Sequence, residues 1–356
     1  MRRLAPILLF LAVLALAGCG RKTVSPGVDP TATAQEQELQ REMFVTKLDG
    51  QVARLENLAR RLAASNVAFC RSQGKTFKSL GLFPMHYRAL PDGDKWAQAH
   101  QKVMGIQPDA LTVLVVTVGG PAERAGLRRG DALLAVNGHD LDVRSRKAAQ
   151  KSWILPHELA QKGDVTLRVQ RDGQESEVTV APEEVCASAF VVAWSNAVNA
   201  MADGRAVYVF QGMMDYAKTD DELALILGHE LAHNVMGHPD SKKAGQVLGM
   251  LLDLALGLGT GVNTGLGAGM GGLAYSQEYE AEADYVGMYF AANAGADLKT
   301  APEIWRRMAA DSPGAMTGGA THPGSAERFT ALEATRAEIE RKKAAGQELL
   351  PEMKTP

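Results

Sequence analysis

The sequence predicts an α+β protein with a mainly helical domain, which carries a small edge-exposed β-sheet, and a second, β-rich domain. Helical spacing of apolar residues in segments 35–66 and 219–239 favours the first domain, and strand-like alternation between residues 67 and 184 favours the second. The chain has 356 residues, 46% hydrophobic and 22% charged, enough for two or three domains with sizeable cores. A net charge of −3 without a long basic run argues against nucleic acid as a partner.

Residues 1–18 have the pattern of a secretory signal peptide. Two arginines precede the apolar run 4–16, which is too short to span a membrane. The run ends in Leu16-Ala17-Gly18-Cys19, which resembles the lipobox of bacterial lipoproteins. The resemblance implies that Cys19 is diacylated and becomes the first residue of a protein tethered to an envelope membrane. Gly20 fits sorting to the outer membrane, and plain cleavage with full secretion is the alternative.

Residues 19–34 are rich in Thr, Pro, Ala and Gly, and they are predicted to form a flexible tether. With Cys19 lipidated, Cys70 and Cys186 remain in an oxidising compartment, where they bracket the middle segment. A disulfide between these two would staple that segment at its base, and two buried thiols are the alternative.

Residues 35–66 are predicted to form a long amphipathic helix. Its apolar stripe consists of Leu48, Val52, Leu55, Leu58 and Leu62. The helix is either a stalk or a part of the helical domain.

The middle segment, residues 67–184, has the patterning of strands and tight turns. Asn137-Gly138 is a strong hairpin-turn signal. Residues 144–161 are predicted to be mostly helical, with Pro156 ending or kinking the helix. The expected strands cover residues 111–118, 132–136, 165–169 and 178–180.

Part of this segment, residues 119–138, reads Gly-Gly-Pro-Ala-Glu-Arg-Ala-Gly-Leu-Arg-Arg-Gly-Asp-Ala-Leu-Leu-Ala-Val-Asn-Gly and resembles a PDZ domain. Ser79-Leu80-Gly81-Leu82 stands where the carboxylate-binding loop of such a domain lies. The resemblance implies that a peptide adds as a strand beside the sheet, with its terminal carboxylate held by that loop. The stretch between Leu82 and Leu111 is unusually long, so the groove could be altered or occupied, and the module could be only a spacer.

The helical domain is expected to cover residues 185–351. Residues 190–201 are predicted to be helical, and residues 206–210 to form a short edge strand. An edge strand just before the helix that begins at Thr219 would be a docking rail for an extended polypeptide.

A strongly predicted helix follows Thr219-Asp220-Asp221-Glu222, which has the pattern of a capping box. Gly237 and Pro239 are a fitting end for this helix. His229 and His233 lie one turn apart, so that both imidazoles can reach one cation. Glu230 is rotated by about 100° from His229 and can take a proton without being a ligand. This is the HExxH pattern of zinc hydrolases, and a chance match on a buried helix is the alternative.

The segment 244–274 is apolar and rich in glycine, but it contains Asp253 and Asn263. It is a poor candidate for a membrane span, because the charge is uncompensated and the glycines weaken a helix. We expect two helical pieces or a flap near the site, with shallow membrane contact as a less favoured hypothesis.

A catalytic zinc needs three protein ligands, and the helix predicted around residues 276–287 offers the third. Glu280 shares a helical face with Ala283, Asp284 and Gly287, whose small members allow close packing on the histidine helix. Glu280 is therefore the candidate ligand, and Asp284 can accept the free N–H of a ligand histidine. The other two glutamates, Glu278 and Glu282, are expected to be solvated. His238 does not fit the third-histidine position of metzincins and is expected to be a supporting or helix-end histidine.

Four short motifs lie between residues 185 and 351. They are Asn199-Ala200, Gly-His-Glu-Leu-Ala-His at 228–233, Glu280-x-x-Ala283-Asp284, and Thr321-His322-Pro323 followed by Arg328. Together they resemble the HtpX/CAAX-prenyl-protease family of zinc endopeptidases, in particular its soluble envelope members.

The resemblance implies one Zn²⁺ per chain, bound by His229, His233 and Glu280, with Glu230 as general base. It also implies that His322 and Arg328 approach the metal from a late loop. There either could help to stabilise the oxyanion, or His322 could block the fourth zinc position at rest. An ordinary loop histidine is the alternative for His322.

These features predict a zinc metalloendopeptidase of the bacterial cell envelope, a periplasm-facing lipoprotein expected in the outer membrane. Its expected substrates are unfolded or misassembled envelope proteins, bound as extended strands. The alternative is a chaperone or assembly scaffold with latent or minor peptidase activity. A metal-free binding lipoprotein is a third hypothesis, which the intact glutamate and ligand residues argue against.

Overall fold

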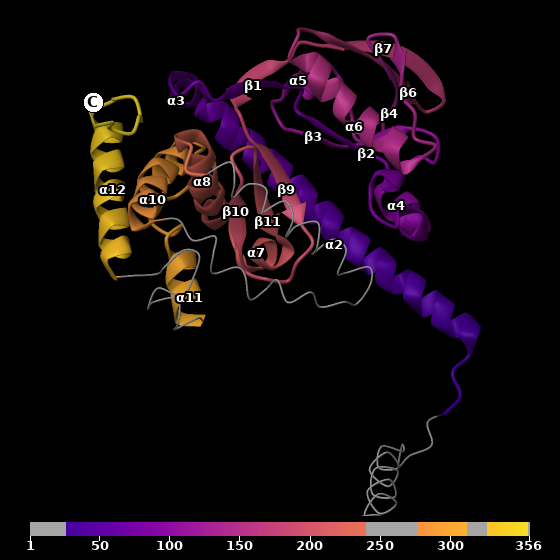
Figure 1. Ribbon diagram of the computed structural model, residues 1–356, viewed down its shortest axis with the longest axis horizontal. Coiled ribbons are helices and arrows are strands. Elements are labelled where there is room, and N and C mark those ends of the chain that lie inside the picture. Colours follow the sequence, from indigo (N-terminus) through magenta and orange to yellow (C-terminus); the bar gives the residue numbers. More distant parts are fainter. Residues whose placement is uncertain (1–25, 240–275, 312–325, 355–356) are drawn as a thin grey trace, which may run out of the picture. The chain divides into compact units, whose positions relative to one another are not determined.

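The computed structural model (Figure 1) describes residues 26–239, 276–311 and 326–354. The expected signal peptide, the lipidation residue Cys19, the glycine-rich segment 244–274 and His322 lie outside the described residues. Within the described ranges, none of the helices combines the length and the hydropathy that a membrane crossing requires. The chain divides into two compact units, Met1–Arg41 and Glu42–Pro356. The described part of the first unit contains the start of helix α2 (Pro30–Ser65), and all other described elements belong to the second.

From Val45 onward, helix α2 is part of the helical domain and not a stalk. Its buried stripe includes Leu48, Leu55, Leu58 and Leu62, as the apolar spacing predicts. These side chains join one core cluster with residues of the helices α8 (Asp220–Met236) and α10 (Gln277–Asn293). The structure therefore shows that this helix is a part of the helical domain.

The base of the middle segment is stapled twice. Helix α3 (Val67–Ser72) carries Cys70, which forms a disulfide with Cys186 of strand β8 (Glu183–Cys186). Strand β8 also pairs antiparallel with β1 (Thr76–Ser79), so the chain enters and leaves the segment side by side. Both cysteines are fully buried.

The β-rich module forms a six-stranded antiparallel sheet in the order β2-β3-β4-β6-β7, with β5 paired to β4. The strands are β2 (Leu82–Met85), β3 (Leu111–Val116), β4 (Ala132–Val136), β5 (His139–Asp140), β6 (Val165–Arg171) and β7 (Gln174–Val180). Asn137 and Gly138 have φ values of 45° and 77° between β4 and β5, which confirms the predicted turn. Besides the short α5 (Pro121–Arg124), helix α6 (Arg146–Ala160) packs on the sheet and continues through Pro156, which therefore does not end it.

The long stretch between β2 and β3 attaches the module to α2. It contains the 3₁₀ turns η1 (Tyr87–Ala89) and η2 (Gly93–Trp96) and helix α4 (Ala97–Met104). Ala99, Met104 and Ile106 belong to the core cluster of the helical domain, not to the core of the module. The extra length thus supplies a helix that anchors the module.

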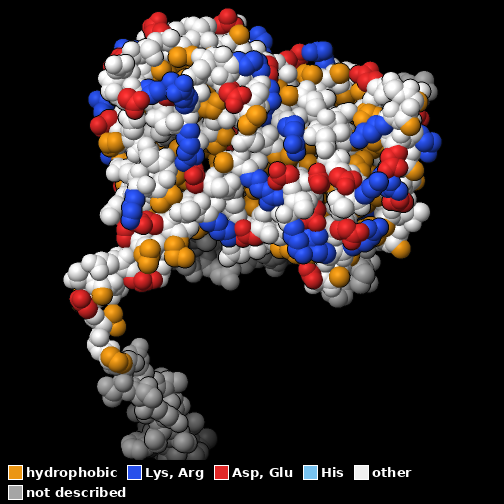
Figure 2. Space-filling view, turned by 180° about the vertical axis from the view of Figure 1, so that it is seen from behind, with side chains coloured by type: hydrophobic (Ala, Val, Ile, Leu, Met, Phe, Trp, Pro, Cys, Tyr) orange, Lys and Arg blue, Asp and Glu red, His pale blue; other side chains and the backbone are white. Residues whose placement is uncertain are grey.

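Polar contacts reinforce this attachment. Arg60 of α2 donates to the carbonyl oxygens of Val118 (3.1 Å) and Gly119 (2.8 Å), and to the carboxylate of Glu183 (2.9 Å). The Nη2 atom of Arg129 in the module donates to both carboxylate oxygens of Asp49 of α2, each at 2.9 Å. The face seen in Figure 2 mixes acidic and basic side chains and shows no patch of one sign.

The helical domain contains a three-stranded sheet whose order corrects two predictions. The segment 190–201 is not a helix, because it forms β9 (Ala189–Ala193), a loop and β10 (Ala200–Ala202). Strand β11 (Ala206–Phe210) has the predicted bounds but is central, with β10 antiparallel on one side and β9 parallel on the other. β-Branched residues such as Val191 and Val192 favour strands. The pairing of β9 with β11 therefore outweighs the weak helical spacing of this segment.

Of the remaining helices, α7 (Gln211–Tyr216) and α8 pack on this sheet. Helix α7 follows β11 and leads into α8, and α10 packs along α8 (Figure 1). Helix α12 (Ala326–Ala344) packs on α10, and α11 (Glu303–Asp311) contributes Ile304 and Trp305 to the same core.

Candidate metal centre

The helix α8 is fixed at both ends, which defines where its side chains point. The hydroxyl of Thr219 accepts from the N–H of Glu222 at 3.2 Å, and the Glu222 carboxylate accepts from the N–H of Lys218 at 2.8 Å. The same carboxylate forms a bidentate pair with Arg307 of α11, at 2.6 and 2.9 Å. Gly237, with φ of 76°, ends the helix in the left-handed conformation that glycine favours.

Two glycines allow α8 and α10 to cross at very short distance. A Cβ atom added to Gly228 would lie 2.5 Å from the carbonyl oxygen of Gly287, and one added to Gly287 would lie 2.7 Å from the backbone nitrogen of His229. Neither position has room for a side chain. The close crossing brings the Glu280–Asp284 face of α10 against the histidine face of α8, as the small residues on that face predict.

The structure brings His229, His233 and Glu280 together around one point. The Nε2 atoms of the two histidines are 3.1 Å apart. That of His229 lies 3.5 Å from Glu280 Oε2, and that of His233 lies 3.5 Å from Glu280 Oε1. Tetrahedral zinc with ligands at 2.0–2.1 Å requires donor atoms roughly 3.3–3.4 Å apart. The three donors therefore have the nature and the spacing of a zinc site, and they form a potential metal-binding cluster in the described part of the chain.

Glu230 follows His229 on α8 and is 1% exposed. Its side chain leaves the helix about 100° away from that of His229. This places a carboxylate beside the donor cluster but outside it, where it can exchange a proton with a water held at the cluster.

His229 is oriented by a buried ion pair. Its Nδ1 lies 2.9 Å from Asp284 Oδ1, and Arg328 donates to both carboxylate oxygens of Asp284, each at 2.7 Å. Burial raises the pKa of Asp284, but Arg328 and His229 outweigh it and lower that pKa below its usual value. Burial likewise lowers the pKa of His229, and the hydrogen bonds to Asp284 and Glu280 reverse this and raise it. A carboxylate partner of this kind fixes the tautomer and makes the imidazole a stronger ligand.

Trp305 closes this side of the site and has no signal in the sequence patterns. The Arg328 guanidinium lies 4.0 Å from the centre of its ring, and the His229 ring meets it edge-on at 5.5 Å. Arg328 is thus placed against Asp284 and Trp305. No contact among the described residues tests the expected role of Arg328 at the oxyanion, which stays a prediction, as does that of His322.

His233 has a different partner, His238. Their Nδ1 atoms are 2.9 Å apart, and His238 Nε2 lies 2.7 Å from Glu282 Oε2. The prediction that His238 lies near the ligands without joining them agrees with this geometry. Glu282 is exposed to solvent, as expected, and its half-exposed carboxylate also accepts from His238, which the sequence did not predict.

Asn234, next to His233, ties α8 to the three-stranded sheet. Its side-chain oxygen accepts from the N–H of Gly204 at 2.6 Å. Its amide nitrogen donates to Ser188 Oγ and to the carbonyl oxygen of Ala206, both at 3.0 Å. These bonds fix the sheet relative to the donor cluster.

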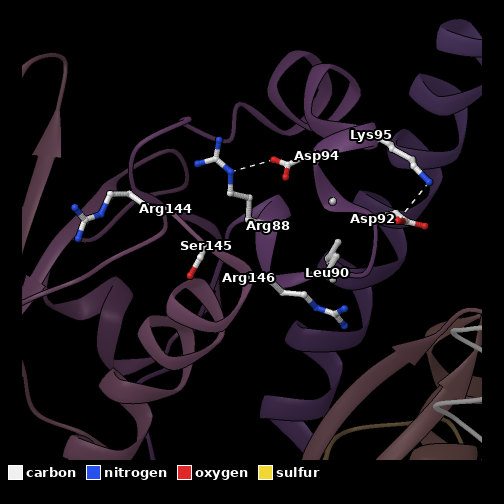
Figure 3. Close-up of a pocket in the computed structure, with 9 residues that line it drawn as sticks. Arg88, Leu90, Asp92, Asp94, Lys95, Arg144, Ser145 and Arg146 are labelled. Atoms are coloured by element: carbon white, nitrogen blue, oxygen red, sulfur yellow. Dashed lines mark hydrogen bonds and ion pairs between the residues drawn. The ribbon is translucent and has the colours of Figure 1, made fainter.

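A cavity of about 270 Å³ in the β-rich module shares no lining residue with the metal centre (Figure 3). Figure 3 shows that its basic side chains do not converge: Arg88 turns to Asp94, whereas Arg144 and Arg146 point to opposite sides. We assign no site there.

Family models match two parts of this chain. Residues 161–336 match the model of peptidase family M48, and residues 112–152 match a PDZ domain. The first region contains the donor cluster, Glu230, Asp284 and Arg328.

Similar proteins agree with the first match. The mitochondrial metalloendopeptidase OMA1 of Schizosaccharomyces pombe is 31% identical over 137 residues, which cover 36% of this chain and 41% of that protein. The mitochondrial metalloendopeptidase OMA1 of Homo sapiens is 33% identical over 117 residues, which cover 29% of this chain and 22% of that protein. The chain therefore spans less than half the length of these relatives. A solved structure, the HtrA3 PDZ domain bound to a phage-derived ligand, is 20% identical and covers 31% of this chain and 88% of that chain, with a TM-score of 0.21.

Proposed function

This chain belongs to peptidase family M48 and carries a PDZ domain, and from that premise we propose that it is a zinc-dependent metalloendopeptidase. One Zn²⁺ per chain is held by His229, His233 and Glu280. The observation that carries the proposal is the spacing of the donor atoms. The two Nε2 atoms are 3.1 Å apart, and each lies 3.5 Å from a different carboxylate oxygen of Glu280, close to the edges of a zinc tetrahedron.

Zinc bound there would act as a Lewis acid, lowering the pKa of the attacking water and polarising the scissile carbonyl. Glu230 takes the proton from the attacking water and returns it to the leaving amine. Asp284, held by Arg328, keeps the Nε2 atom of His229 directed at the cluster.

We infer that the substrate binds as an extended strand beside β10. This strand is antiparallel to β11, and it packs against α8. The central position of β11 excludes it as the docking strand, and of its two outer neighbours β10 is the one that packs against α8.

The general-base assignment is tested with Glu230→Gln. We expect this variant to bind one zinc per chain, as the parent does, and to cleave casein at least about 100-fold more slowly. Glu278→Gln, which changes an exposed glutamate near the site, is the control and should cleave casein normally. Undiminished cleavage by Glu230→Gln, or a parent protein that binds no zinc, would refute the proposal.

The proposed setting is the bacterial cell envelope, with Cys19 diacylated and the domains facing the periplasm from the outer membrane. The proposed substrates are unfolded or misassembled envelope proteins, and the PDZ domain is proposed to bind a peptide in its groove. The lipobox-like tetrapeptide supports the setting, and the M48 and PDZ matches support protein or peptide substrates.

Substrate trapping with the Glu230→Gln form in native envelopes tests both the proposed substrates and the proposed location. We expect unfolded envelope proteins to co-purify with it from the outer-membrane fraction, and Cys19→Ser to release the protein from that fraction. If Glu230→Gln instead corrects an envelope-stress defect as well as the parent does, the scaffold alternative is favoured.

A further inference from the structure

His238 is brought back over His233 by the way α8 ends. Gly237 takes the left-handed conformation, and the N–H of His238 donates to the carbonyl oxygen of His233 at 3.0 Å. This is the closing bond of a Schellman motif, in which the residue after the glycine folds back onto the last turn. The position of the His238 ring therefore follows from backbone geometry.

The ring of His238 is held on three sides. Its Nδ1 faces His233 Nδ1 at 2.9 Å, its Nε2 faces Glu282 at 2.7 Å, and Tyr279 stacks on it with ring centres 4.5 Å apart. The His238 side chain is 2% exposed, whereas that of Glu282 is 44% exposed. Glu282 and Tyr279 both come from α10, which also supplies the ligand Glu280.

Only one arrangement of protons along this chain is compatible with metal binding by His233. If the Nε2 of His233 is a ligand, its Nδ1 must carry the proton and donate to His238 Nδ1. His238 must then carry its own proton on Nε2, where it donates to the carboxylate of Glu282. Each donor meets an acceptor along the whole chain.

We propose that the Glu282–His238 pair is a positioning device for the ligand His233, with Tyr279 holding the His238 ring in place. The inference rests on the proposed zinc site. The two ligand histidines thus have unlike supports: a buried carboxylate paired with arginine for His229, and an imidazole connected to a half-exposed carboxylate for His233.

The test is zinc affinity, measured on the full chain by competition with a chromophoric chelator. His238→Leu removes the acceptor and should weaken zinc binding by about 10–100-fold, the usual effect of losing such a partner. His238→Asn restores an oxygen near the place of Nδ1 and should recover part of the affinity. Glu282→Gln keeps an acceptor without charge and should weaken binding less than His238→Leu, while Glu278→Gln should not change it.

Two further measurements make the outcome decisive. In the cobalt-substituted protein, the visible absorption should change for His238→Leu and not for Glu278→Gln, because the coordination geometry changes. Thermal unfolding of the metal-free protein shows whether His238→Leu folds, and if it does not, Glu282→Gln carries the test. Parent-like zinc affinity and cobalt spectrum in the folded His238→Leu and Glu282→Gln variants would overturn the inference. A parent that binds no zinc would instead overturn the proposed function.

Discussion

The donor atoms of the metal centre are oriented by bonds that join residues far apart in the sequence. Helix geometry is local, so the i, i+4 spacing was sufficient to place His229 and His233 on one face. The helical face that Glu280 shares with small residues also predicts its position against the histidine helix, because those small residues are visible in the sequence. Trp305 and the partner of His238 could not be predicted, since each depends on how a separate helix packs.

Asn234 provides a prediction at the scale of one residue. Replacement by Ala removes three hydrogen bonds and leaves the N–H of Gly204 without its partner, whereas the carbonyl oxygen of Ala206 keeps the N–H of Asp203. Buried polar groups that lose a partner each cost about 1–3 kcal/mol. We expect Asn234→Ala to lower the free energy of unfolding by a similar amount, measured in urea, and to raise KM for casein while zinc affinity stays close to that of the parent.

Asn234→Asp is the matched control. It keeps the acceptor for Gly204 but sets an oxygen against the carbonyl oxygen of Ala206, so it should be no more stable than Asn234→Ala. A KM equal to that of the parent in both variants would show that the sheet is not positioned through this residue.

At the scale of elements, the crossing of α8 and α10 is a contact that leaves no room for a side chain at Gly228 or Gly287. Gly287→Ala should gain up to about 1 kcal/mol from helix propensity, but its Cβ would lie 2.7–2.8 Å from the backbone of Gly228 and His229. Such overpacking costs about 1–3 kcal/mol, and it separates the helices that carry the ligands. We expect lower stability in urea and weaker zinc binding.

The control for this prediction is Ala281→Gly, at an exposed position of α10. It should lose about 1 kcal/mol of stability from propensity alone and bind zinc normally. A Gly287→Ala variant that is more stable than the parent, with unchanged zinc affinity, would contradict the close crossing.

Helices and strands are predicted well where local sequence signals are strong, and poorly where pairing with a distant strand determines the structure. The bounds of β4 and β11, the Asn-Gly turn and the ends of α8 follow from patterns of a few residues. The strands β9 and β10 each gain their stability from pairing with β11, which lies outside the few residues that form the local pattern. For the same reason the sequence could identify β11 as a strand but not as the central one.

At the scale of the whole molecule, the disulfide closes a segment with a sequence separation of 116 between its cysteines. Loop-closure entropy predicts a stabilisation of roughly 2–5 kcal/mol for such a crosslink. We expect the double variant Cys70→Ser/Cys186→Ser to lose stability in this range, measured by urea unfolding. Reducing agent should destabilise the parent similarly and leave the double variant unaffected, and equal stability of the two proteins without reductant would contradict this.

Anchoring of the PDZ module through α4 and Arg60 has a consequence for product lengths. A module that swings freely would let the chain behind a captured terminus be cut at many points. If the module binds a substrate by its carboxyl end, as proposed, its fixed attachment to the helix that builds the peptidase core would place cleavage at a set number of residues from that end. Fragments released from such substrates would then share a narrow size distribution.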